Sequence, residues 1–206
     1  MFTINTLSTV KQEIRKSNFL SYLVPMSEFE NFHLKLKEEH PKAVHIVWAY
    51  RHYNKYLQIV ENQSDDGEPK GTSGPPALNA LRGANLIECG VFIVRYFGGI
   101  KLGTGGLVRA YSSSVNLAID EAKLLPYELK DEFHFFVPFA LISRFEHFLT
   151  KEELKADKEF NENGAFINLS LNLDEFKKLF EFTKPFLIQG VEFLCIPIFA
   201  KEIFEK

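Results

Sequence analysis

Glycine is crowded into one part of this chain, and that crowding constrains the fold more than any other feature. Ten of the 12 glycines in the 206 residues lie between Gly67 and Gly106, and the other two are Gly164 and Gly190. Glycine suits positive φ, tight turns and close approaches, and it costs conformational entropy elsewhere. The window reads as loop, short helix, buried strand, loop and longer helix. We therefore expect two glycine-rich loops that shape or bind something.

Length and composition indicate a globular protein with enough apolar residues for one large domain or two modest ones. No run approaches the roughly 18 apolar residues that a membrane span needs, and the N-terminus lacks the pattern of a signal peptide. Cys89 and Cys195 lie in apolar, strand-like runs, so we expect both to be buried free thiols that suit a reducing compartment. These features predict a cytoplasmic protein that does not contact membranes.

The pattern of apolar residues predicts an α+β fold in two domains, residues 1–126 and 130–206. In the first domain we expect a strand pair, a helix that Ser27 caps and Pro41 ends, and a hairpin. A short helix, a buried strand and a helix that stops before Pro126 follow. The expected ranges of these elements are 8–25 for the strand pair, 43–61 for the hairpin, 76–86, 86–96 and 102–125.

Beyond Pro126 glycine nearly vanishes, and the elements follow the order β-α-β-β-α-β of a ferredoxin-like domain. Asn172 and Asp174 can cap its second helix. The expected strands are 131–138, 158–162, 165–171 and 191–199, and the expected helices are 140–154 and 174–182.

Positive charge coincides with the glycine-rich segment. Residues 70–116 carry Lys70, Arg82, Arg95, Lys101 and Arg109 against Glu88 alone, whereas the chain as a whole has a net charge of −3. Such a patch suits phosphate or another anion. We therefore take these five cations as candidate residues for binding nucleic acid or another anion.

The glycines themselves match no nucleotide-binding template. No Lys-Ser/Thr pair follows a G-x-x-x-x-G frame, and Val108 stands where a dinucleotide motif needs its third glycine. The glycine loop before residue 107 can still hold an anion on the free amides of the helix that it enters, or it can serve tight packing. We expect Gly98 or Gly99 to adopt positive φ, because a buried strand turns abruptly there.

Acidic residues in the first loop leave two interpretations open. Asp65, Asp66 and Glu68 can hold Mg²⁺ or act as acid and base, with His45 as a fourth member of such a cluster, or they can serve turn chemistry. A calcium loop that begins at Asn62 is excluded, because its twelfth position needs a bidentate Glu and is occupied by Ser73. No His or Cys spacing suits zinc, so we expect no metal and no cofactor. Arg95 can likewise clamp phosphate beside exposed aromatic residues or pair with one of these carboxylates.

The strings SDDGEPKGTSGPP (64–76) and VRYFGGIKLGTGGLVRAY (94–111) resemble the signatures of the IMPACT family, including its bacterial YigZ-like members. AVHIVWAY, which contains His45, resembles a further family segment. The family-motif residues are His45, Asp65, Asp66, Gly67, Glu68, Pro69, Gly71, Arg95, Tyr96, Gly98, Gly99, Gly103, Gly105 and Gly106.

The resemblance implies a first domain similar to domain IV of elongation factor G and a second similar to its domain V. Eukaryotic relatives act in translational control through an additional N-terminal domain that this sequence lacks, so that role is not transferred. It also implies no catalytic residue. We expect a non-catalytic, translation-associated protein that binds RNA or the ribosome, with a translation factor or regulatory protein as a further partner. The alternatives are a small hydrolase or phosphate-ligand enzyme using Asp65, Asp66, Glu68 and His45, and a protein-interaction module built on the Phe-rich second domain.

Overall fold

The computed structural model describes residues 1–43 and 45–201 of the chain. The chain divides into two compact units, Met1–Tyr127 and Glu128–Lys206, where the sequence analysis expected domains at 1–126 and 130–206. Both units combine strands and helices around hydrophobic clusters of their own. The fold is therefore α+β in two domains.

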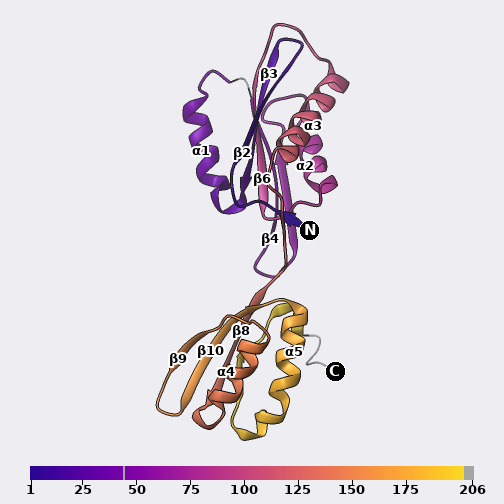
Figure 1. Ribbon diagram of the computed structural model, residues 1–206. Helices are drawn as coiled ribbons and strands as arrows, with labels where there is room; N and C mark the ends of the chain where they lie inside the picture. The colour runs from indigo at the N-terminus through magenta and orange to yellow at the C-terminus, as the bar shows by residue number, and fades with distance from the viewer. Residues whose placement is uncertain (44, 202–206) are drawn as a thin grey trace. The chain divides into compact units, whose positions relative to one another are not determined.

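The first unit is built on a five-stranded antiparallel sheet with the strand order β2-β3-β6-β4-β5. The central strand β6 is buried at every position except its last, because helices cover both faces of the sheet (Figure 1). Strands buried on both faces read as continuous apolar runs, which is why this segment was recognisable from sequence. The strands are β2 Ser8–Ile14, β3 Ser17–Pro25, β4 His45–Tyr53, β5 Ile59–Ser64 and β6 Cys89–Tyr96.

Three helices complete this unit. Helix α1 (Phe29–Glu39) lies on one face of the sheet, and α2 (Gly74–Gly83) and α3 (Thr104–Asp120) lie together on the other (Figure 1). Tyr111 of α3 and Phe19 of β3 are fully buried between α3 and the sheet and meet edge to face at 5.3 Å. This packing holds α3 against the sheet.

Helix α3 ends at Asp120 rather than at the expected residue 125. The chain leaves the helix early because Leu125–Pro126 forms a short strand, β7, which pairs antiparallel with β1 (Phe2–Thr3). This pairing joins the two ends of the unit, so it is a contact between residues more than 120 positions apart. A local stop signal such as Pro126 carries no information about it.

The second unit has the ferredoxin-like order of elements that the sequence predicted. Its antiparallel sheet runs β11-β8-β10-β9, and phenylalanines such as Phe133, Phe135, Phe145 and Phe176 are fully buried. The elements are β8 Asp131–Pro138, α4 Ile142–Lys151, β9 Asp157–Phe160, β10 Gly164–Leu171, α5 Leu173–Thr183 and β11 Glu192–Cys195. Short 3-10 helices lie at Met26–Glu28, Phe139–Leu141, Lys184–Gln189 and Ile198–Ala200.

Three local expectations meet different outcomes. Asn172 caps α5 as predicted, in a reciprocal capping box with Glu175. Ser27 does not cap α1, because a 3-10 turn precedes the helix and its N-cap position is Glu28. Cys89 is buried, but Cys195 is exposed, since a shift of register between Phe193 and Cys195 interrupts the alternation of β11.

Within the described part of the chain, no helix combines the length and the apolar character needed to cross a membrane.

Candidate functional site

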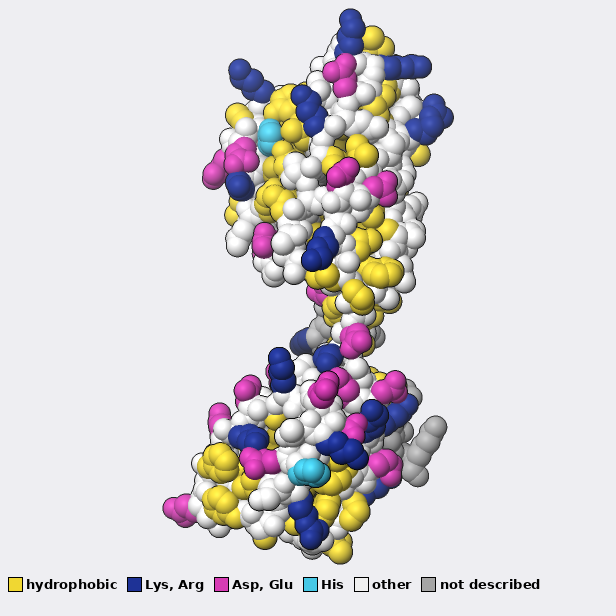
Figure 2. All heavy atoms as spheres, viewed as in Figure 1, with side chains coloured by type: hydrophobic (Ala, Val, Ile, Leu, Met, Phe, Trp, Pro, Cys, Tyr) yellow, Lys and Arg dark blue, Asp and Glu magenta, His cyan; other side chains and the backbone are white. Residues whose placement is uncertain are grey.

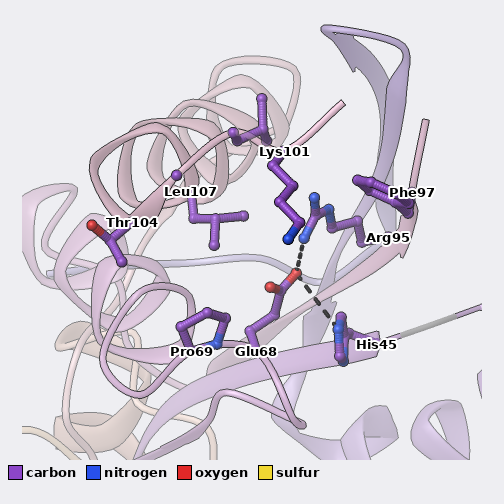
Figure 3. Close-up of a pocket in the computed structure, with 10 residues that line it drawn as sticks. His45, Glu68, Pro69, Arg95, Phe97, Lys101, Thr104 and Leu107 are labelled. Atoms are coloured by element: carbon purple, nitrogen blue, oxygen red, sulfur yellow. Dashed lines mark hydrogen bonds and ion pairs between the residues drawn. The ribbon is translucent and has the colours of Figure 1, made fainter. Parts of the chain in front are cut away.

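The two glycine-rich loops of the first unit line one pocket of about 460 Å³. His45 of β4 and Glu68 and Pro69 of the loop after β5 form one side of it (Figure 3). Arg95 and Phe97, at and beyond the end of β6, and the segment from Lys101 to Leu107 complete the wall. Loops from separate parts of the sequence therefore share one cavity, which lies at the amino end of α3.

Glu68 is the buried centre of the pocket's polar side, with only 7% of its surface exposed. Its Oε1 atom accepts hydrogen bonds from Arg95 Nη1 and, at 2.7 Å, from the Tyr111 hydroxyl. His45 Nε2 lies 4.0 Å from the same oxygen. Burial and the adjacent Glu68 carboxylate raise the pKa of Tyr111 far above its usual value, so its hydroxyl remains a donor.

Arg95 is buried beside this carboxylate, and its ion pair with Glu68 is one of the two alternatives that the sequence analysis left open for this arginine. The guanidinium carbon also lies 5.6 Å from the ring centre of Phe19 and 5.7 Å from that of Phe97. Its Nε atom is buried and has no hydrogen-bond partner among the described residues. A buried donor without an acceptor costs free energy, so this arginine retains unused binding capacity.

Asp65 and Asp66 hold the backbone of the first loop. Asp65 accepts hydrogen bonds from the N–H groups of Gly71, Ser73 and Gly74, and Asp66 Oδ2 accepts one from Ile46 N at 2.5 Å. Burial tends to raise the pKa of Asp65, but these donors and the Ser73 hydroxyl outweigh it and lower the pKa. The alternative acid–base cluster therefore loses two of its four members to turn chemistry.

His45 is also oriented by this loop, because its Nδ1 lies 2.6 Å from the carbonyl oxygen of Asp66. A carbonyl only accepts, so Nδ1 carries the proton and donates it. In the neutral ring Nε2 is then an acceptor at the pocket. No group of three or more His, Cys, Asp or Glu side chains suited to a metal ion occurs among residues 1–43 and 45–201.

The remaining motif residues shape the second loop. Gly99 has φ +84°, which confirms the expected positive φ at this turn, and Gly98 lies so close to the β2–β3 turn that a Cβ atom would come 2.0 Å from the Lys16 carbonyl. Tyr96 bonds His40 Nδ1 at 2.8 Å. Gly67 and Gly71 lie in the first loop, Gly103 is the N-cap of α3, and Gly105 and Gly106 stand in its first turn.

The amino end of α3 has no capping side chain and no acidic residue in its first turn. The N–H groups of Thr104, Gly105 and Gly106 precede the first intrahelical donor position, and Leu107 N donates to Gly103 O. These amides and the helix dipole make this end of the pocket attractive to an anion.

The five cations expected to bind together are separated by the fold. Arg95 is paired with Glu68, and Arg82 lies at the far end of α2, where it forms an ion pair with Glu61. Lys70 is exposed in the first loop. Lys101 lines the pocket together with Arg95. It adjoins Leu102, which lines both this pocket and a second hollow of about 280 Å³, and Arg109 lines that second hollow.

Two cations that the sequence analysis missed join them. Arg15 lines the second hollow with Arg109, and Lys16 adjoins Gly98. We call Arg15, Lys16, Lys101 and Arg109 the basic end of the unit. No ion pair occupies any of the four within the described chain, and Lys and Arg side chains gather at the upper end of this unit in Figure 2.

The other pocket residues missed from sequence are Leu102, Thr104 and Leu107, and Tyr111, the buried donor to Glu68, was missed as well. The spacing of Leu107 and Tyr111, four apart on one helix, was the available signal that both face the same way. The signal for Arg15 and Lys16 was two adjacent cations in a predicted hairpin turn.

This fold and site define an α+β protein whose N-terminal unit closes two glycine loops around one pocket. The family model described as Impact N-terminal domain matches residues 15–119, a range that contains both glycine-rich loops. The chain belongs to the IMPACT family.

Its relatives include an IMPACT family member of Haemophilus influenzae, 46% identical over 59% of this chain and 59% of the relative. The Escherichia coli member YigZ is 39% identical over 61% of this chain and 66% of its own length, and Bacillus subtilis YvyE is 33% identical over 80% and 77%. The chain thus covers less than two thirds of the first two relatives. A solved crystal structure titled as a hypothetical protein matches with a TM-score of 0.66 at 28% identity, over 95% of this chain and 96% of that one.

Proposed function

We propose that this protein binds RNA through the basic end of its first unit, as a non-catalytic, translation-associated factor whose RNA-bearing partner is the ribosome. The observation that carries the proposal is a gathering of four cations that form no ion pair with any described residue. They come from three separate segments: the β2–β3 turn, the loop after β6 and helix α3. Clustered, unpaired Lys and Arg side chains are the electrostatic signature of phosphate binding.

The conformation of the β2–β3 turn supports this role for its cations. Arg15 and Lys16 both adopt positive φ, 47° and 65°. Two-residue hairpin turns of this type favour Asn-Gly, and residues with larger side chains occupy the left-handed region at a cost in free energy. Two cations held at such a turn are therefore explained better by binding than by stability.

The charge distribution supports a defined RNA site over general attraction to nucleic acid. Residues 1–127 carry 14 basic and 12 acidic side chains, whereas residues 128–206 carry 10 and 15. The negative second unit disfavours indiscriminate binding to a polyanion. A structured RNA such as that of a ribosome, with a translation factor or regulatory protein alongside, fits this balance.

The test compares two triple variants of equal charge change. Lys16→Gln/Lys101→Gln/Arg109→Gln removes three cations of the basic end, and Lys35→Gln/Lys37→Gln/Lys42→Gln removes three exposed cations of α1 and the turn after it. Ribosome co-sedimentation and anisotropy with single-stranded RNA are measured between about 50 and 200 mM salt.

Wild type should bind with a slope of log affinity against log salt of about −3, at about 0.7 for each phosphate neutralised. The basic-end variant should lose about two units of that slope, and the α1 variant should bind like wild type. Absence of both ribosome and RNA binding at low salt, or equal losses in the two variants, would contradict the proposal.

A further inference from the structure

The pocket beside the basic end shares Lys101 with it and adds features that the salt-dependent contacts do not use. It has apolar walls from Pro69, Leu102 and Leu107, and its polar groups converge from Arg95, Lys101 and the amino end of α3. Figure 3 shows the Lys101 amine and the Arg95 guanidinium directed to the same side of the cavity. Its volume of about 460 Å³ lies in the range of small-molecule sites.

Resting on the proposed function, we infer that this pocket receives one nucleotide of the bound RNA. The phosphate lies at the amino end of α3 beside Lys101, and the base lies against the apolar walls. Three observations converge on an anion: the free amides of Thr104–Gly106, the absence of acidic residues from that turn, and the buried Nε of Arg95 without a partner.

A nucleotide explains the remaining groups better than an isolated anion does. Glu68 and, in the neutral ring, the Nε2 atom of His45 are acceptors at the pocket, and they match the hydroxyl and amino donors of a nucleoside. Phe97, 49% exposed at the rim, offers a ring beside the Arg95 guanidinium, a combination that binds bases by stacking.

The pocket adjoins the second hollow, which favours an RNA strand over a single small anion as the ligand. Leu102 lines both cavities, and Arg15 and Arg109 line the second one. A chain that places one phosphate at α3 therefore meets further cations at the next position. The carboxylate end of a peptide satisfies α3 equally well but leaves this second pair of cations unused.

The matched variants for this site are Thr104→Glu and Thr104→Gln. Thr104 is exposed at the first position of α3, where a glutamate interacts favourably with the helix dipole, so neither change should unfold the protein. The glutamate places a negative charge where the phosphate is expected, whereas the glutamine has the same size without the charge.

The experiment titrates the full chain with nucleoside 5′-monophosphates, nucleosides, inorganic phosphate and a short peptide with a free carboxylate. NMR follows the amides of residues 103–107 and the Arg95 Nε–H signal. Nucleoside monophosphates should shift both sets of signals and bind at least tenfold more tightly than nucleosides or phosphate. Thr104→Glu should weaken this binding, and that of single-stranded RNA, by about tenfold or more, and Thr104→Gln should not.

RNA binding without any shift from mononucleotides, and with equal affinity in both Thr104 variants, would overturn this inference and leave the proposed function standing. Loss of RNA, ribosome and mononucleotide binding together would overturn both. Phosphate or the peptide binding as tightly as the mononucleotides would show that the site does not select a nucleotide.

Discussion

At the scale of single residues, the Arg95–Glu68 pair should stabilise the first unit strongly. Arg95→Ala leaves the Glu68 carboxylate buried without its cation, and breaking a buried pair in this way costs about 3–5 kcal/mol. Urea unfolding followed by the fluorescence of Trp48, the chain's only tryptophan, measures this unit. A double-mutant cycle with Glu68→Gln should be strongly non-additive.

The matched control is Arg82→Ala, which removes an arginine whose side chain is 49% exposed and paired with Glu61. Exposed pairs contribute about 1 kcal/mol or less, so this variant should unfold near wild type. Equal losses for the two arginines would show that burial of the Arg95 pair has no special consequence.

A second residue-scale prediction concerns acid stability. The pKa of Asp65 is lowered in the folded protein, because backbone N–H donors and the Ser73 hydroxyl outweigh the opposing effect of burial. A depressed folded pKa contributes stability that is present above the unfolded value, near 3.9, and is lost as pH falls through the folded value. Unfolding by urea should therefore become easier as pH drops below about 4.

Asp65→Asn should reduce this pH dependence and lower stability at neutral pH, since an amide accepts these bonds more weakly. Glu38→Gln, a change at an exposed carboxyl on α1 without an ion pair in the described chain, should leave the profile unchanged. An Asp65→Asn profile that parallels wild type between about pH 2 and 7 would contradict the assignment.

At the scale of elements, replacing glycine by alanine should have opposite effects on the free energy of unfolding at two positions six residues apart. Gly99→Ala places a side chain at φ +84°, although open space surrounds its Cβ, so the change should cost about 1 kcal/mol through the backbone alone. Gly105→Ala lies in the first turn of α3 and meets only the end of Arg109, at 3.8 Å, so it should stabilise by up to about 1 kcal/mol. Urea midpoints that move in the same direction would refute this account of the loop.

The elements also show how far the sequence alone could lead. The apolar run of β6 and the Asn172 cap were predictable because their signals are local. The early end of α3 was not, since it depends on pairing between Leu125–Pro126 and Phe2–Thr3. The same holds for the site. The glycine-rich loops were predictable from the sequence, but the fold decides which carboxylate of Asp65, Asp66 and Glu68 pairs with Arg95.

The basic end shows that the distribution of surface charge also cannot be predicted from the sequence alone. Counting along the sequence placed Arg82 with the other cations of residues 70–116, but helix α2 carries it to Glu61. Arg15 and Lys16 lie more than 80 positions before Lys101 in sequence, and the β2–β3 hairpin brings them to the same end of the unit. Surface charge therefore follows the strand order of the sheet, which residue counts do not contain.

At the scale of the whole molecule, residues 1–127 should fold and bind RNA without the second unit. Their sheet, their short β1–β7 pairing and their hydrophobic clusters are complete within this range. Removing residues 128–206 removes 15 acidic and 10 basic side chains, which repel RNA on balance. The fragment should show the same Trp48 unfolding transition as the full chain. Its RNA affinity should be equal or several-fold higher at about 50 mM salt, with the difference shrinking as salt screens the charges. A folded fragment that has lost RNA binding would place the binding surface in the second unit.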